Sequence, residues 1–189
     1  DTLLAKHGES TDEILPKGQI FTRVSTVAEK EVRPGAYATY LPHDVARYMS
    51  TWGSESNRHK IAIEALDDVK VPGLKTRFKT MGELLNKPMD DSVKKGQTLR
   101  QYIISREPTW RSKIWARFAP PAELGKHVYA REIGNNWNTG IGKAFTQRLI
   151  KTGYGAMLDD NDSINLAKKP MVLLKSDLFK VVSNKQMSK

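Results

Sequence analysis

Residues 145–182 read FTQRLIKTGYGAMLDDNDSINLAKKPMVLLKSDLFKVV, and the fold of the chain is best worked out from them. The spacing predicts that a helix ends at Gly153 and that a short strand over 154–158 runs into the acidic residues 159–162. A loop then leads to a strongly apolar strand over 171–174. Three carboxylates therefore directly follow a strand, in a chain whose formal net charge is +10.

The remaining segments place strands at both ends of the chain and helices between them. Period-two alternation with β-branched residues predicts strands. Apolar residues at helical spacing predict helices, one of them opened by Pro42 and two of them separated by Pro108. This order is not a regular βαβα alternation, so the sequence predicts an α+β fold with mixed, mostly antiparallel strands and a helical middle. The further predicted strands are 19–26, 36–41 and 60–66, and the further predicted helices are 76–85 and 143–151.

We expect residues 1–189 to form a single domain, and several of its segments carry weaker signals. Residues 1–18 are expected to be an opening segment in which a Ser/Thr–Glu cluster caps a short helix. Residues 67–73 are expected to turn at a Pro-Gly pair. A helical basic insertion is expected over 92–140, followed within it by a short strand around 127–130. Residues 183–189 are polar and basic, which favours a flexible tail.

Composition excludes several classes of protein. The chain has no cysteine, so it holds no disulfide and no Cys-ligated zinc. No apolar run approaches the roughly 20 residues that span a bilayer, and no signal peptide is visible. The chain opens at Asp1 and not at Met, which favours a processed or excised piece. The pI is near 9.7. The excess positive charge either attracts a polyanionic partner such as nucleic acid or only keeps the protein in solution.

Motif searches find no strong catalytic signature. There is no GxGxxG, no phosphate-binding P-loop and no HExxH motif. The four histidines are scattered without metal-ligand spacing, so no metal site is predicted.

The acidic residues 159–162 have three interpretations. They are a solvated turn, half of a calcium loop that lacks its glycine and its distant glutamate, or a catalytic carboxylate that stabilises a cationic sugar as a glycosidic bond breaks.

Five segments, taken in order, resemble ADP-ribosyltransferase-type toxin and phage domains. That family has a strand with an arginine, a second strand with Ser/Thr or aromatic residues that enters a helix, and a late strand followed by an acidic segment. The likeness covers residues 19 to about 60 and 145–182, roughly half of the chain. The segments are QIFTRVST, GAYATYLPHDVARYMSTWG, KIAIEALDDVKVPG, KTGYGAMLDDND and PMVLLKSDLFKVV.

The resemblance implies an ADP-ribosyltransferase-like fold and an activity. The domain would bind NAD, cleave the nicotinamide–ribose bond, and pass ADP-ribose to a protein, a nucleic acid or water. Such domains are toxins or effectors, secreted or delivered into a target cell, and an immunity protein is a possible partner. The rival functions are a basic toxin ribonuclease and a non-enzymatic nucleic-acid-binding or phage structural module.

The resemblance also implies roles for particular residues. Arg23 resembles the arginine that grips NAD, and its planar guanidinium suits that work. Thr39 and Tyr40 resemble the second motif, which braces the site and offers a ring for nicotinamide. Asp160 or Asp162 would replace the catalytic glutamate that the family normally uses, with Glu132 as the alternative acid elsewhere in the chain.

Residues 94–118 interleave cations with aromatic rings and match no part of that family. Aromatic residues at helical spacing favour a buried core with the Lys and Arg side chains solvated. The other interpretation is a surface for acceptor or nucleic acid, because cations neutralise phosphates and rings stack on bases. The contact residues predicted for such a surface are Arg100, Arg106, Trp110, Arg111, Lys113, Trp115 and Arg117.

Overall fold

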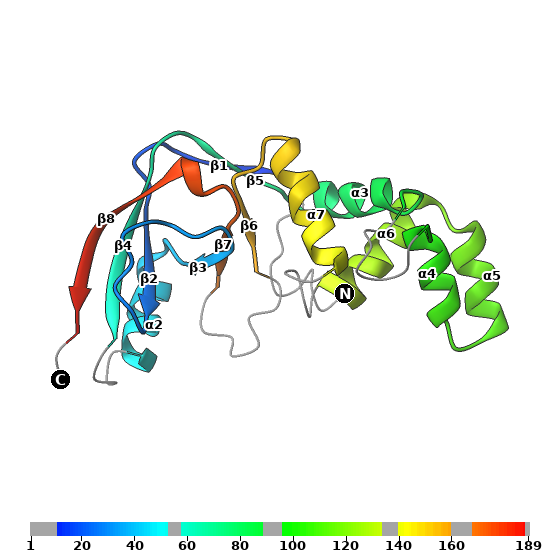
Figure 1. Cartoon of the computed structure of the whole chain (residues 1–189), viewed down its shortest axis with the longest axis horizontal. Helices are drawn as coiled ribbons and strands as arrows, with labels where there is room; N and C mark the ends of the chain where they lie inside the picture. Colours follow the sequence, from blue (N-terminus) through cyan, green and yellow to red (C-terminus); the bar gives the residue numbers. More distant parts are fainter. Residues whose placement is uncertain (1–10, 53–57, 89–95, 134–139, 160–167, 188–189) are drawn as a thin grey trace.

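A computed structural model describes residues 11–52, 58–88, 96–133, 140–159 and 168–187. Figure 1 shows an elongated molecule with the strands in one half and most of the helices in the other. All strand pairs in the described part are antiparallel. The α+β class and the placement of the helices between two groups of strands are therefore confirmed.

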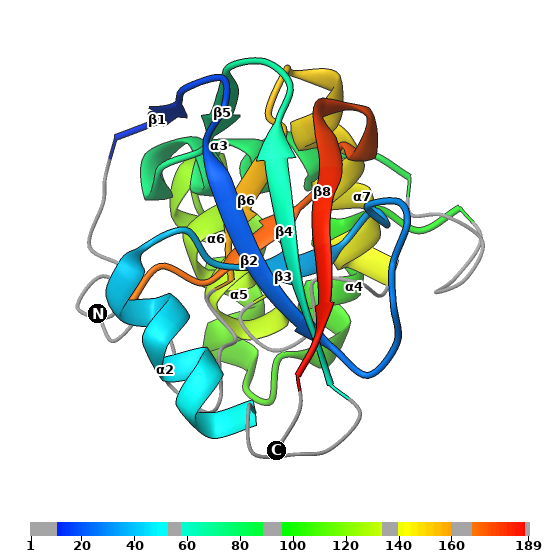
Figure 2. The ribbon, with the colours of Figure 1, turned by 90° about the vertical axis from the view of Figure 1, so that its left-hand side faces the viewer.

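The outer sheet has the strand order β2-β4-β8 and lies in front in Figure 2. Its inner face buries Phe21, Ile61 and Ile63. The period-two pattern of these segments predicts strands with one buried face, as observed. Phe21 meets the rings of Tyr40 and Phe179 edge-to-face. The three strands are β2 (Ile20–Ser25), β4 (His59–Ala65) and β8 (Phe179–Gln186).

The prediction of a flexible tail over 183–189 is wrong for its described part. Ser183 and Asn184 pair with Ala62 and Ile61 in β8, so the strand continues to Gln186. The side chains there are polar and exposed, which is why the sequence resembles a tail. The backbone hydrogen bonds come from β4, more than a hundred residues earlier in the chain, and local sequence does not reveal such a partner.

The inner sheet has the order β3-β7-β6 and is covered on both faces. Met157 and Val172 belong to the core beneath the helices, whereas Leu158, Met171 and Leu173 belong to the core shared with the outer sheet. This two-sided burial explains why the late strands read as continuous apolar runs. The strands are β3 (Ala36–Ala38), β6 (Ala156–Leu158) and β7 (Met171–Leu173).

A third, two-stranded pairing corrects two expectations. β1 (Glu13–Leu15) is a strand where a helix cap was expected, and it pairs with β5 (Val69–Val71), where the residue pattern by itself predicted a turn and the resemblance implied the end of a strand. Each strand has three residues, too short for a period-two pattern to stand out from its neighbours. Leu15, Val69 and Val71 join the core between the sheets.

The helices confirm most of the expected pattern. Pro42 opens α2, and the two helices on either side of Pro108 are present. The strand expected around 127–130 is wrong, because that segment ends α6 and continues into a π-helical turn, η1. None of the described helices is long and apolar enough to cross a membrane. The helical elements are α2 (Pro42–Trp52), α3 (Leu74–Leu84), α4 (Leu99–Arg106), α5 (Trp110–Phe118), α6 (Pro121–Val128), η1 (Tyr129–Ile133), α7 (Gly140–Lys151) and the 3-10 turn η2 (Ser176–Leu178).

Two glycines let α3 and α6 approach closely. A Cβ atom on Gly125 would lie 2.5 Å from the carbonyl oxygen of Phe78 and 2.8 Å from the amide nitrogen of Gly82. A Cβ atom on Gly82 would lie 2.7 Å from the carbonyl oxygen of Pro121. The neighbouring Leu124 and Val128 are fully buried. The close contact with α3 therefore sets the position of α6 and of η1, which continues it.

Candidate nucleic-acid interface

Helices α4 and α5 form a hairpin at the end of the molecule opposite the outer sheet (Figure 1). Each helix begins with a capping box, Thr98 with Gln101 and Thr109 with Ser112. Pro108 stands between them, where it ends one helix without interrupting the other. The local sequence therefore sets where both helices begin and where the first one ends.

Helix α5 is covered on one narrow side only. Ala116 is its single buried residue, and Ser112 is half-buried. Trp110 and Phe118 are 67% and 75% exposed, and Ile114 and Trp115 are exposed as well. The interpretation of the aromatic residues in this helix as core is therefore wrong. Exposed large apolar side chains gathered on one helix mark a binding surface more often than an ordinary solvated face.

Positive charge surrounds these rings. Arg111, Lys113 and Arg117 are exposed on α5, and the Arg111 guanidinium lies 5.4 Å from the centre of the Trp110 ring. At 100° per residue, Trp110, Ile114 and Phe118 form one stripe with cations on both sides. The one acidic residue of the hairpin, Glu107, is buried and bonded to Arg131. The exposed surface of α5 thus combines rings with cations and contains no carboxylate.

Arg100 has a structural role that the sequence did not indicate. Its Nη1 atom donates to the carbonyl oxygens of Ala116, Arg117 and Ala119, each at 3.1 Å. These are end groups of α5 that have no partner within the helix, so Arg100 fastens the C-terminus of α5 to α4. We therefore assign it to holding the surface together.

Arg106 also has an internal partner. Its guanidinium lies 5.4 Å from the centre of the Tyr102 ring, one turn earlier on α4, and Nη1 donates to the Tyr102 hydroxyl. The side chain is nevertheless exposed. Arg106 extends the positive surface around the turn that joins the two helices.

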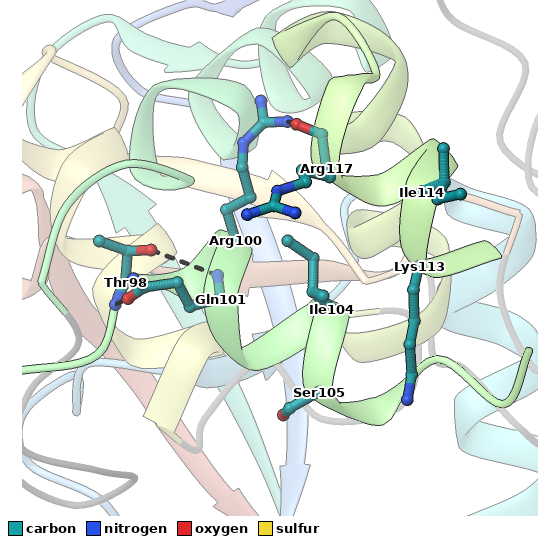
Figure 3. Close-up of a pocket in the computed structure, with 8 residues that line it drawn as sticks. All are labelled: Thr98, Arg100, Gln101, Ile104, Ser105, Lys113, Ile114 and Arg117. Atoms are coloured by element: carbon teal, nitrogen blue, oxygen red, sulfur yellow. Dashed lines mark hydrogen bonds between the residues drawn. The ribbon is translucent and has the colours of Figure 1, made fainter. Parts of the chain in front are cut away.

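A groove of about 660 Å³ lies between α4 and α5. Figure 3 shows the Arg117 side chain reaching from α5 toward α4 above Ile104, and the Lys113 side chain extending downward from α5 on the right. This volume lies within the roughly 300–1,000 Å³ that ligand pockets occupy. Its lining is Thr98, Arg100, Gln101, Ile104, Ser105, Lys113, Ile114 and Arg117.

In the β half, the predicted NAD-binding arginine is paired internally. Nε of Arg23 donates to both carboxylate oxygens of Glu29, at 3.1 and 3.2 Å, and Nη1 donates to the carbonyl oxygen of Tyr37 at 3.1 Å. Glu29 is buried. The pair stabilises the loop after β2, since removing Arg23 would leave a buried carboxylate without its counter-charge.

Thr39 and Tyr40 follow β3 and join a polar cluster. The Thr39 hydroxyl donates to Oδ2 of Asp44 at 3.3 Å, and the Tyr40 hydroxyl donates to Oε1 of Glu13 at 3.1 Å. Lys169 Nζ lies 3.0 Å from the other oxygen of Glu13. Burial and the nearby Glu13 charge raise the pKa of Tyr40 above its ordinary value.

Asp44 is the centre of that cluster, although its sequence context indicates only the start of a helix. It is fully buried and accepts hydrogen bonds from the backbone amides of Lys168 and Lys169 at 2.9 and 3.0 Å. Burial opposes its ionisation. The hydrogen bonds from these amides, His43 and Thr39 outweigh burial and hold the pKa of Asp44 below its ordinary value. The only available signal was an acid in the first turn of a helix opened by proline.

The predicted catalytic acids, Asp160 and Asp162, lie outside the described residues, as does the side chain of Glu132. Asp159 is described, and it is buried with its amide donating to the carbonyl oxygen of Pro170 at 2.7 Å. Within the described ranges, no group of three or more His, Asp and Glu side chains is arranged to hold a metal ion. Comparison of the chain with protein families, curated proteins and solved structures finds no match.

Proposed function

We propose that this protein binds single-stranded nucleic acid through the exposed surface of α5 and the groove beside it. The observation that carries the proposal is the exposure of α5, which buries one residue of nine and presents two Trp, one Phe and one Ile. A helix that exposes these side chains leaves a large area of apolar surface uncovered.

The charges around those side chains favour nucleic acid as the partner. Arg111, Lys113 and Arg117 supply positive charge for phosphates, and the rings between them supply flat faces for bases. Single strands fit this surface better than duplexes because their bases have free faces on which a ring can stack. The net charge of +10 adds long-range attraction to either form.

The test removes charge from the groove and measures the salt dependence of binding. A labelled single-stranded oligonucleotide is titrated by fluorescence anisotropy at several salt concentrations. Each cation that neutralises a phosphate contributes about 0.7 to the slope of log K against log salt. The double variant Lys113→Ala, Arg117→Ala should therefore flatten the slope by about 1.4 (two contacts at about 0.7 each) and weaken binding.

A matched control removes the same charge elsewhere. Lys180 and Lys185 are exposed on β8, in the opposite half of the molecule. The double variant Lys180→Ala, Lys185→Ala should keep the slope of the wild type. An equal loss in both double variants would mean that net charge attracts the nucleic acid and that α5 has no special part in binding.

A second candidate is ADP-ribosyl transfer by an ADP-ribosyltransferase-like fold, and one observation favours it. Thr39 and Asp159 follow β3 and β6, which flank β7 in the inner sheet, so both residues lie at the same sheet edge beside Pro170. Arg23 contacts Tyr37 two residues before Thr39. Segments far apart in the sequence that the resemblance assigns to one site therefore lie near one another, which supports this candidate. Against this, NAD would have to displace Glu29 from Arg23.

The second candidate is tested by incubating the protein with NAD and measuring released nicotinamide. Transferase or glycohydrolase activity predicts release above the uncatalysed rate, and release should fall in Arg23→Lys because a lysine cannot reproduce the bidentate grip. No release in the presence of protein acceptors, nucleic acid or water alone would remove this candidate and leave the binding proposal intact.

A further inference from the structure

His127 stands at the edge of the α5 surface and is used by neither proposal above. It lies in the last turn of α6, and its ring meets Trp115 edge-to-face with 5.2 Å between the ring centres. The side chain is 40% exposed. A strand laid on Trp115 and the neighbouring cations would therefore pass directly beside an accessible imidazole.

A buried carboxylate lies behind this ring. The Nε2 atom of His127 is buried and lies 3.6 Å from Oε1 of Glu107, which is longer than a hydrogen bond but within ion-pair range. Such contacts are often long before a substrate binds. One ring nitrogen, Nε2, thus faces a carboxylate, while the side chain as a whole stays 40% exposed. This is the arrangement in which an acid orients a histidine for proton transfer.

Glu107 is suited to that role because it stays ionised. Burial by itself favours its neutral form, but hydrogen bonds from Arg131 and Ser112 and the charge of Arg131 outweigh burial and lower the pKa of Glu107. Arg131 Nη1 donates to Oε1 of Glu107 at 2.6 Å. An ionised carboxylate 3.6 Å from Nε2 can fix the orientation of the His127 ring.

Arg131 reaches Glu107 from an unusual stretch of backbone. It belongs to the π-helical turn η1, which continues α6. Single π-helical turns are rare and occur frequently at functional sites. Its side chain is partly exposed, so its positive charge lies next to the carboxylate and reaches the surface there.

We propose that His127, oriented by Glu107, makes the α5 surface a site that cleaves single-stranded RNA. The inference rests on the proposed function, since it requires the strand to lie on α5. His127 is the catalytic residue. Glu107 is a positioning residue, and Arg131 adds positive charge beside the phosphate.

The reaction needs no co-reactant other than water. His127 accepts the proton of a ribose 2′-hydroxyl, and the 2′ oxygen forms a bond to the adjacent phosphorus. The bond from phosphorus to the 5′ oxygen breaks, and that oxygen takes a proton from solvent. The imidazolium then returns its proton to solvent. The products are a 2′,3′-cyclic phosphate end and a free 5′-hydroxyl end, and DNA cannot react because it lacks the 2′-hydroxyl.

The experiment follows cleavage and binding of one end-labelled RNA together. The wild type should yield 2′,3′-cyclic phosphate ends, and the matching single-stranded DNA should bind without being cut. His127→Ala should slow cleavage about 10²- to 10⁴-fold, the usual contribution of a general base, with affinity changed less than threefold. Free imidazole in the buffer should restore part of the rate. His43→Ala, an exposed histidine on α2, should cleave as the wild type does.

Each outcome decides between the proposals. RNA binding without cleavage overturns the ribonuclease inference and leaves the binding function standing. Cleavage that persists in His127→Ala, or that imidazole fails to restore, overturns the assignment of His127. No binding of RNA or DNA overturns both. In Glu107→Gln, a positioning role predicts an altered pH profile of the cleavage rate with binding retained, and an unchanged profile contradicts it.

Discussion

The double variant Trp110→Ala, Phe118→Ala is expected to bind single-stranded RNA at least about 30-fold more weakly than the wild type. Stacking of a base on an aromatic ring contributes about 1–3 kcal/mol. The two residues stand eight positions apart, about 12 Å along the helix, so their effects should add. Two contacts at the lower limit already give about 2 kcal/mol, which corresponds to that loss of affinity.

The folded state should tolerate both changes. The two side chains are mostly exposed, and surface substitutions of this kind change the free energy of unfolding by about 0.5 kcal/mol or less. Anisotropy measures the binding, and denaturant unfolding checks the fold. Ile14→Ala is the matched control, because Ile14 is 61% exposed on β1 and should leave binding unchanged. Equal affinity of the double variant and the wild type would show that the rings do not touch the strand.

The substitution Gly125→Ala is expected to destabilise the whole protein by about 1–3 kcal/mol. In an unobstructed helix the change would stabilise, since alanine favours helix over glycine by about 1 kcal/mol. Here the new methyl group would lie 2.5 Å from the Phe78 carbonyl oxygen, and the obstacle is backbone that cannot rotate away. Helix α6 would have to move off α3, and this opens the core around Leu124.

Helix propensity alone would raise the free energy of unfolding, whereas the backbone clash would lower it, so the direction of the change decides between them. Denaturant unfolding of Gly125→Ala should show a lower midpoint, whereas stabilisation would contradict the close approach of α3 and α6. Gly18→Ala provides a contrast, because no atom lies within 4 Å of its Cβ position but its φ is +83°. It should cost only the penalty of left-handed backbone, about 1–2 kcal/mol.

The fold was predictable where local signals agreed with tertiary packing. Pro42 opens a helix as its fixed φ suggests, and Pro108 separates two helices with their own capping boxes. The segment around 127–130 was wrongly predicted because His-Val-Tyr-Ala favours strand locally. In the structure, burial of Leu124 and Val128 one turn apart keeps it helical. Polar residues 183–186 became a strand only because β4 offers them backbone partners.

The sequence reveals which residues make up the candidate site, but it does not reveal that their side chains are exposed. The sequence identified the cations and rings of α5, but four large apolar residues among nine fit a buried helix as well as a binding surface. Only the tertiary structure decides which neighbours cover them. Arg100 could not be recognised as a helix cap, because its three carbonyl partners lie 16 to 19 residues later. The pairing of His127 with Glu107 likewise depends on how α6 packs against the hairpin.

The most direct test of the account is to locate a bound strand on the protein by cross-linking. A single-stranded oligonucleotide carrying photoreactive 4-thiouridine is irradiated in complex with the full chain, and the attached peptides are identified by mass spectrometry. Attachment is expected within residues 98–119, chiefly at Trp110, Trp115 or Phe118. Attachment confined to the β2-β4-β8 sheet, or none at a concentration that saturates binding, would contradict it.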